Sequence, residues 1–295
     1  MREGHGPRAA GHKRLAADHP KDGSLHPAHG TIDAPVIVVG ASGTIGRAVV
    51  QGLVAKSRRV VAVAPDRDRL AALKAEHPVG VVANFDYRVG DDLGARRLAE
   101  QLAALDRPFA GVVVAFPIGR YPAPTERGRL LDLPADELRA CLDRSLVSQF
   151  SLARHLIPLL GRSARNSSYV IIGGPGSVSP LAGYGHRSVA RAATRMLAQV
   201  LHDEAQPLGV RVHLVSIDAP VRGESPGAHE CPEWPSVGGI AGRVVDLFDR
   251  GAAHERADTI VACGRAVGYD LARAARGVFS SVPAFLDSLK KGSPS

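Results

Sequence analysis

From residue 34 onward, short apolar runs alternate with longer segments in which apolar residues recur every three to four positions. Continuous apolar runs are typical of buried strands, and the 3.6-residue recurrence is typical of helices with one buried face. The expected strands are Val36–Val39, Val60–Val63, Val79–Phe85, Gly111–Ala115, Tyr169–Ile172, Val210–Ile217 and Thr259–Cys263. The expected helices are Thr44–Ala55, Arg67–Glu76, Gly94–Leu105, Pro134–Leu160, Tyr184–Glu204 and Ser236–Arg250. This alternation predicts an α/β fold: one doubly wound parallel sheet of about seven strands, with helices on both faces.

The longest expected helix, over residues 134–160, begins with a proline, which fits the first turn of a helix. Apolar residues along this helix predict a stripe that faces the core over its whole length. The stripe comprises Leu138, Leu142, Leu146, Ala153 and Ile157.

Two end segments fall outside the alternating pattern. Residues 1–33 are rich in Gly, Pro, His and charged residues and lack an apolar centre, which predicts a disordered tail rather than a signal peptide. Residues 265–295 form a C-terminal extension, in which spaced apolar residues favour a partly amphipathic helix. The predicted domain therefore spans residues 34–264.

Three regularly spaced glycines, Gly40, Gly43 and Gly46, follow the first expected strand. Gly40 allows a tight turn, Gly43 allows the backbone to approach a pyrophosphate, and Gly46 allows the next helix to pack closely on the strand. The N-terminus of that helix offers unpaired backbone N–H groups to a phosphate. The order strand, glycine turn, helix and second strand predicts a Rossmann-like dinucleotide site. The expected contacts in the turn are Gly40, Ser42, Gly43, Thr44, Ile45 and Gly46.

The end of the second expected strand bears on the choice of cofactor. Asp66 lies twenty residues beyond Gly46, where an acid can bind a ribose 2′-hydroxyl, whereas Arg67 and Arg69 can bind a 2′-phosphate. Because the strand ends in Ala-Pro rather than in an acid, the sequence favours NADP(H) over NAD(H), with Arg67 as the expected ligand. The alternative is that these three residues cap and solvate the start of the next helix.

The composition limits the classes of partner. The 295 residues carry a formal net charge of +8 at pH 7, but the basic residues are spread along the chain, which argues against a nucleic-acid surface. Cys141, Cys231 and Cys263 lie far apart, so they predict no metal site and no disulfide framework and fit a reducing cytoplasm. No apolar run reaches the ~20 residues that a membrane helix needs.

With its motifs in this order, the chain resembles the short-chain dehydrogenase/reductase family over about residues 34–264. The glycine turn, Asp86 after the third strand, the long fourth helix, Tyr184 at the start of the fifth helix and Val210–Val221 all occur in the family's order. The resemblance implies an NAD(P)-dependent oxidoreductase. It also implies that the adenine lies near Asp86 and the nicotinamide near Pro220 and Val221.

The resemblance adds expectations at the end of the fourth strand and in the catalytic centre. Ala115, the last residue of the fourth expected strand, stands in the segment Val-Ala-Phe-Pro (residues 114–117), which matches a family segment at the end of that strand, and is an expected cofactor contact. The family's chemistry rests on a tyrosine, a lysine, a serine and an asparagine, of which Tyr184 matches the tyrosine. Ser188 stands at the lysine position, Ser145 at the asparagine position, and residues 172–175 (Ile-Gly-Gly-Pro) at the serine position.

Two other residues are expected to assist Tyr184. A free tyrosine has a pKa of about 10, so without a neighbouring cation it is a poor base at neutral pH but can still act as an acid. Arg187, three residues further along the helix, can supply a fixed positive charge. Ser177 or Ser179 in the preceding loop can reach a substrate oxygen, with Ser177 taken as the expected site residue. The alternatives are that Tyr184 is only a packed aromatic residue and that Arg187, Arg191 and Arg195 form a solvated or interface stripe.

Three functions follow from these residues. The first is the reduction of a small-molecule carbonyl by NADPH through an altered relay, with Tyr184 as the acid. The second is cofactor binding without redox chemistry, as in a sensor or a regulatory subunit, and the third is a cyclase or isomerase that uses the same pocket. The fifth helix is rich in alanine, which allows close helix contact, so a homodimer or homotetramer is expected, with neither nucleic acid nor membrane as a partner.

Overall fold

The computed structural model describes residues 34–87, 90–116, 128–163, 166–181, 183–219, 221–222, 234–249 and 259–263. The expected N-terminal tail and C-terminal extension lie outside these ranges, so the domain boundaries stay predictions. Pro220, an expected nicotinamide contact, also lies outside them.

Seven parallel strands form one sheet, in the order β3-β2-β1-β4-β5-β6-β7. They are β1 (Val36–Val39), β2 (Val60–Ala64), β3 (Val81–Asp86), β4 (Gly111–Val114), β5 (Ser167–Ile172), β6 (Val210–Ile217) and β7 (Ile260–Cys263). The chain builds outward from β1 to β3 on one side and from β4 to β7 on the other, so the order reverses between β1 and β4. The predicted doubly wound parallel sheet is therefore confirmed.

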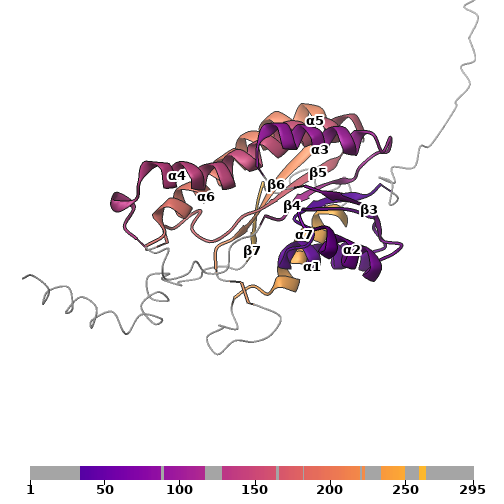
Figure 1. The fold of residues 1–295 in the computed structure, drawn as a ribbon, viewed down its shortest axis with the longest axis horizontal. Helices are drawn as coiled ribbons and strands as arrows, with labels where there is room; N and C mark the ends of the chain where they lie inside the picture. Colours follow the sequence, from indigo (N-terminus) through magenta and orange to yellow (C-terminus); the bar gives the residue numbers. More distant parts are fainter. Residues whose placement is uncertain are drawn as a thin grey trace, which may run out of the picture.

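Helices cover both faces of the sheet (Figure 1). One face carries α1 (Thr44–Ala55), α2 (Arg67–Glu76) and α7 (Val237–Asp249), and the other carries α3 (Asp92–Ala103), α5 (Ser148–Ser163) and α6 (Gly185–Ala205). Because both faces are covered, neighbouring strand residues such as Val36 and Ile37 are buried in opposite clusters. This burial explains why the strands read as continuous apolar runs.

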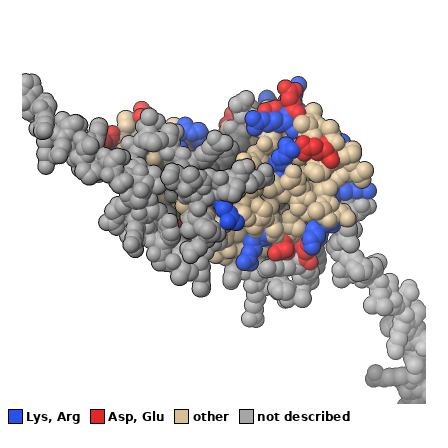
Figure 2. Space-filling view, turned by 90° about the horizontal axis from the view of Figure 1, so that it is seen from below, with Lys and Arg blue, Asp and Glu red and all other residues tan. Residues whose placement is uncertain are grey.

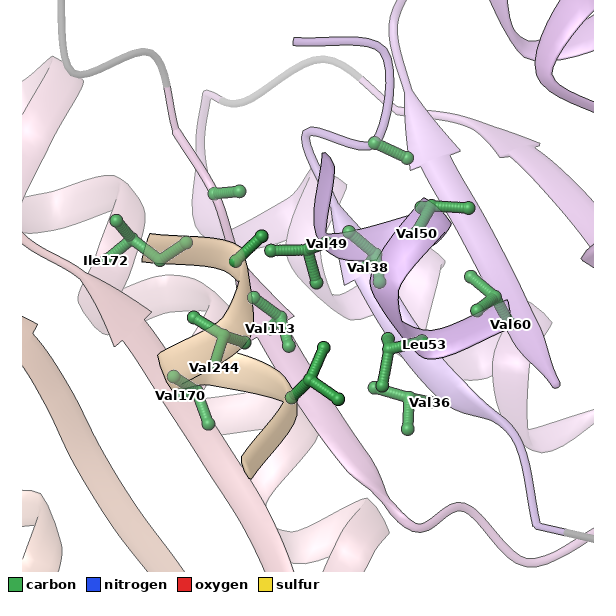
Figure 3. Close-up of a cluster of buried hydrophobic side chains, with 14 of the residues drawn as sticks. Val36, Val38, Val49, Val50, Leu53, Val60, Val113, Val170, Ile172 and Val244 are labelled. Atoms are coloured by element: carbon green, nitrogen blue, oxygen red, sulfur yellow. The ribbon is translucent and has the colours of Figure 1, made fainter. Parts of the chain in front are cut away.

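Aliphatic side chains fill the layer between the sheet and the helices α1 and α7 (Figure 3). Val49, Val50 and Leu53 project from α1, and Val244 projects from α7. They pack on the strand residues Val36, Val38, Val60, Val113, Val170 and Ile172. This contact holds α1, and with it the glycine turn before it, firmly against the sheet.

The long helix expected over residues 134–160 is divided into three segments. They are α4 (Ala135–Leu142), the π-helical segment η3 (Asp143–Val147) and α5. The predicted buried stripe is correct in α5, where Ala153 and Ile157 are buried, but no residue of α4 or η3, both described in full, is buried. The prediction is wrong there because α4 packs mainly against α6 rather than against the sheet (Figure 1).

Other element boundaries differ from the predictions by a few residues. β3 begins at Val81 rather than at Val79, because Val79 is exposed in the preceding turn. β5 begins at Ser167 rather than at Tyr169, because the buried Ser167 and Ser168 also pair with neighbouring strands. Two short 3-10 helices, η2 (Leu130–Asp132) and η4 (Gln206–Leu208), complete the described elements. Within the described ranges, no helix has the length and apolar character needed to cross a membrane.

The packing of α1 on the turn before it can be tested with two helical glycines. A Cβ on Gly46 would lie well inside 3.0 Å of the Gly40 carbonyl oxygen, so Gly46→Ala is expected to lower the free energy of unfolding by roughly 3 kcal/mol. Gly242→Ala in α7 is the matched control, because nothing lies within 4 Å of a Cβ there. Its free energy of unfolding should rise by roughly 0.5–1 kcal/mol. Urea denaturation measures both, and equal stability of the two variants would contradict the close packing.

Candidate active site

The turn between β1 and α1 lies where the strand order reverses. Gly40 has φ +86°, and a Cβ on it would also clash with the backbone carbonyl oxygen of Ala115, just beyond β4. The Ala115 amide donates to the Val39 oxygen at 2.8 Å, and the Gly40 amide donates to the Val63 oxygen at 2.8 Å. The turn is thus bonded to both neighbouring strands, at the edge of a doubly wound sheet where ligands bind.

The N-terminus of α1 opens onto this edge without a side-chain cap. Gly43 is the N-cap residue, no side chain bonds to the first turn, and the first turn contains no acidic residue. The amide groups of the first turn are therefore available to an anion, and the helix dipole favours one. Thr44 is exposed, whereas Ser42 and Ile45 are half-buried, and Ile45 packs against the same core cluster as Ala115 and Val221. These residues fit the pyrophosphate of a dinucleotide.

Arg67 and Asp86 meet at the ends of β2 and β3. Arg67 Nε and Nη2 donate to Asp86 Oδ2 at 2.8 and 2.6 Å. The hydrogen bond and the positive charge of Arg67 lower the pKa of Asp86 below its ordinary value. The side chains are 81% and 50% exposed, so solvent reaches both. The structure thus brings together the two residues expected at the adenosine end of the cofactor.

Asp66 caps α2, in agreement with the alternative interpretation of this segment. Asp66 Oδ1 accepts from the Arg69 amide at 3.0 Å, and Arg69 Nε lies 3.2 Å from Asp66 Oδ2. Asp66 and Arg69 therefore stabilise the first turn of α2, whereas the Arg67 side chain bonds to Asp86.

Tyr184 is the N-cap residue of α6 and is 7% exposed. Its amide donates to the Leu181 oxygen at 3.0 Å, and its carbonyl accepts from the amides of Arg187 and Ser188 at 3.0 and 3.1 Å. The neighbouring Gly183 carbonyl accepts from the Gly128 amide at 3.0 Å. The backbone therefore fixes Tyr184 at the carboxyl edge of the sheet, the same edge that carries the glycine turn.

Ser188 and Ser145 use their hydroxyls in local bonds. Ser188 Oγ accepts from the Leu181 amide at 2.9 Å and lies 3.5 Å from the Tyr184 carbonyl, to which it donates. Ser145 Oγ donates to the Cys141 carbonyl within the π-helical segment η3. Ser188 thus fastens the loop that leads to Tyr184, and Ser145 stabilises a type of helical distortion that is frequent at functional sites.

The arginines of α6 do not form the solvated stripe that was one expectation. Arg191 Nη1 donates to the Pro175 carbonyl, and Arg195 Nη1 donates to Ser216 Oγ at 3.3 Å. Burial and the positive charge of Arg187 lower the pKa of Arg191 to about 10. A solvated stripe is therefore wrong for Arg191 and Arg195, because α6 lies against β6 and both side chains bond to groups at the sheet edge. An interface stripe, the other form of this expectation, stays a prediction.

A polar cluster at the end of β6 includes residues that sequence reasoning missed. Ser177 Oγ lies 3.4 Å from Asp218 Oδ1, and Ser216 Oγ lies 3.1 Å from each oxygen of the same carboxylate. Only Ser177 was expected in the site. Ser216 and Asp218 were detectable as polar residues two apart at the end of an apolar strand, where alternate side chains share one face. Within the described ranges, no group of three or more His, Cys, Asp or Glu side chains could hold a metal ion.

Comparison with known proteins identifies the family. Residues 34–219 match the family described as short chain dehydrogenase, which covers more than half of the chain. The protein therefore belongs to the short-chain dehydrogenase/reductase family and is an NAD(P)-dependent oxidoreductase. Family membership favours this function over the two non-redox alternatives.

Individual relatives are distant. The rhamnolipids biosynthesis 3-oxoacyl-[acyl-carrier-protein] reductase of Pseudomonas aeruginosa is 26% identical over 186 residues, which cover 61% of this chain and 70% of the relative. A short-chain dehydrogenase from Streptomyces avermitilis has a TM-score of 0.63 at 23% identity, covering 88% of this chain and 98% of that one. The NADPH-bound short chain oxidoreductase of Pseudomonas aeruginosa that contains an atypical catalytic center has a TM-score of 0.65 at 20% identity, covering 78% and 96%. At these identities the two structures are similar in fold.

Proposed function

We propose that this protein reduces the carbonyl of a small molecule with NADPH and that Tyr184 donates the proton. The observation that carries the proposal is the position of Tyr184, buried at the start of α6 on the sheet edge that also holds the glycine turn. The bound cofactor supplies the hydride. A tyrosine hydroxyl is protonated at neutral pH and can pass its proton to the oxygen of the carbonyl as that oxygen gains negative charge.

The surrounding residues have separate tasks in this proposal. The glycine turn and the N-terminus of α1 bind the pyrophosphate. Arg187, next to the half-buried Arg191, contributes positive charge near the start of α6. Ser177 faces the substrate oxygen from the loop before α6. Ser188 and Ser145 maintain the backbone around Tyr184.

Two relatives support this chemistry. The curated relative in Pseudomonas aeruginosa is a 3-oxoacyl reductase, and such an enzyme reduces a carbonyl. The NADPH-bound neighbour is described as containing an atypical catalytic center. We infer that this chain also binds NADPH and works with a centre in which only the tyrosine keeps its usual identity.

The role of Tyr184 can be tested by removing one oxygen atom. Tyr184→Phe should lower the rate of NADPH oxidation with a carbonyl substrate by about 100-fold or more, because a positioned general acid contributes about 10²–10⁴. Calorimetry should show NADPH affinity within about twofold of the wild type, since the turn that binds the pyrophosphate is unchanged.

Tyr169→Phe is the matched control. The Tyr169 hydroxyl is buried in β5 with no hydrogen-bond partner among the described residues, so its removal should leave turnover unchanged. Unchanged turnover in Tyr184→Phe would remove Tyr184 from the mechanism. If the wild type instead bound NADPH but failed to oxidise it with any carbonyl compound of a broad panel, that result would favour the non-redox alternative.

We further propose that Arg67 makes the cofactor NADP(H) rather than NAD(H). A solvent-exposed ion pair is weak, so the 2′-phosphate can replace Asp86 as the partner of the Arg67 guanidinium. Asp86 then lies next to the phosphate-binding arginine and is also the expected contact for the adenine. In this proposal the two paired residues lie side by side, with Arg67 at the 2′-phosphate and Asp86 at the adenine.

Calorimetry with both cofactors tests this preference. Arg67→Ala should lower the ratio of NADPH to NADH affinity about tenfold, because a charge-assisted hydrogen bond to phosphate is lost. Asp86→Asn frees Arg67 and should raise the ratio, even if the loss of an adenine contact weakens both cofactors. Asp136→Asn, which breaks the pair with Arg139 on α4, is the control and should leave the ratio unchanged. A ratio that Arg67→Ala does not alter would contradict the proposal.

We propose that two copies of the chain associate through α5 and α6. Val189, Met196 and Val200 are exposed apolar residues spaced by seven and four positions on α6, so they share one face of that helix. Val147 at the end of η3 and Phe150 at the start of α5 add exposed apolar side chains. Exposed apolar surface on neighbouring helices favours association with another protein surface.

Light scattering tests the association. The wild type should have at least twice the mass of one chain, and Met196→Glu should lower the mass, because Met196 is 60% exposed in one chain and the new charge would be buried in the dimer. Val79→Glu is the control, since Val79 lies in an exposed turn on another part of the molecule. A monomeric wild type, or a Met196→Glu variant of unchanged mass, would contradict the proposed face.

The remaining proposals concern location and other partners. Figure 2 shows basic and acidic side chains close together on the described surface of the face in view. The visible described surface therefore lacks the continuous basic stripe that binds a phosphate backbone, which supports the expectation of no nucleic-acid partner. Cytoplasmic location is proposed from the three separated cysteines, of which Cys141 and Cys263 are free in the structure.

A further inference from the structure

A chain of hydrogen bonds connects α6, β6 and the loop between β5 and α6. Arg195 Nη1 donates to Ser216 Oγ at 3.3 Å. Ser216 Oγ in turn donates to the Asp218 carboxylate, 3.1 Å from each oxygen. Ser177 Oγ donates to Asp218 Oδ1 at 3.4 Å. Because each hydroxyl has one proton, both serines point their hydrogens at Asp218, and the carboxylate is the common acceptor.

The support of Asp218 is rigid. Ser216 is 1% exposed within β6, and Asp218 follows two residues later, so the two side chains lie on the same face of the chain. A half-buried carboxylate needs hydrogen bonds to replace those it loses to water. The two serine hydroxyls supply these bonds, and Arg195 in turn holds Ser216 by donating to its Oγ.

The loop that carries Ser177 is also bonded on either side of that residue. Before Ser177, the Pro175 carbonyl accepts from Arg191, and after it the Leu181 amide donates to Ser188 Oγ. Both of these partners lie on α6. The bond from Ser177 to Asp218 instead connects the middle of the loop to the end of β6. Asp218 therefore sets the position of the Ser177 oxygen relative to the sheet edge, where the cofactor and Tyr184 are proposed to meet.

We propose that Asp218 is a positioning residue that acts through Ser177, an inference that rests on the proposed role of Ser177 in carbonyl reduction. Asp218 holds the Ser177 side chain and the middle of its loop in place at the sheet edge. In the free protein the single hydrogen of the Ser177 hydroxyl is directed at Asp218. When the carbonyl binds, this hydrogen turns to the substrate oxygen, which gains negative charge as the carbon gains the hydride, while Asp218 keeps its bond from Ser216. Neither Ser177 nor Asp218 exchanges a proton with the substrate.

Amide hydrogen exchange tests the positioning without any turnover. Asp218→Ala should raise the exchange rate of the segment 173–181 about tenfold, because the middle of the loop loses its bond to β6. Asp218→Asn keeps the shape of the side chain but loses the charge, and should give a smaller increase in the same segment. Asp246→Ala, at an exposed aspartate of α7, is the control and should change nothing in this loop. Unchanged exchange in Asp218→Ala would overturn the proposal.

A double-mutant cycle tests the action through Ser177. Asp218→Ala should lower kcat for carbonyl reduction about tenfold and leave the KM for NADPH within about twofold, and Ser177→Ala should lower kcat at least as much. Combining the two should give no loss beyond that of Ser177→Ala, because Asp218 then has no hydroxyl to hold. A further tenfold loss in the double variant would overturn the proposal.

The two experiments separate this inference from the proposed function. If the wild type reduces no carbonyl, the proposed function fails. The exchange experiment still decides in that case whether Asp218 holds the loop.

Discussion

The close approach of two backbone segments at the centre of the sheet is the constraint on which the rest of the molecule depends. The turn at Gly40 lies directly against the Ala115 carbonyl, where no side chain fits. Gly46, in the first turn of α1, lies just as close to the Gly40 carbonyl. This contact brings β1 and β4 side by side at the point where the strand order reverses. It also directs the uncapped N-terminus of α1 to the edge where the site lies. The turn proposed to bind the cofactor is thus a direct product of backbone packing.

A second constraint concerns the loop between β5 and α6. Three side chains hold this loop from outside: Arg191 at Pro175, Asp218 at Ser177 and Ser188 at Leu181. The resemblance to the family implies a lysine at position 188, and a small serine there lets the loop bond directly to α6. Arg187 and Arg191 stand one residue before and three residues after this position on α6. The loop is thus fixed from two sides, by α6 and by the end of β6.

Several parts of the fold and of the site could be predicted because their causes are local. The continuous apolar runs at Val36–Val39 and Val210–Ile217 are typical of strands buried on both faces, and the glycine spacing after β1 is typical of a turn that binds a dinucleotide. The stripe through Leu138 and Leu146 was misleading, because apolar spacing predicts which residues share a face and leaves open what that face meets. In the native fold it meets α6 rather than the sheet.

The sequence by itself determined the order of strands and helices along the chain, the position of the glycine turn and the tyrosine at the start of α6. These depend on neighbouring residues, whose periodicity and steric demands are visible in the chain. Only the tertiary structure decided that Arg67 pairs with Asp86, that Arg195 reaches Ser216, and that Ser177 meets Asp218, 41 residues away. Such pairs form because parallel strands end at one edge, so polar groups that are distant in sequence become neighbours when the sheet assembles.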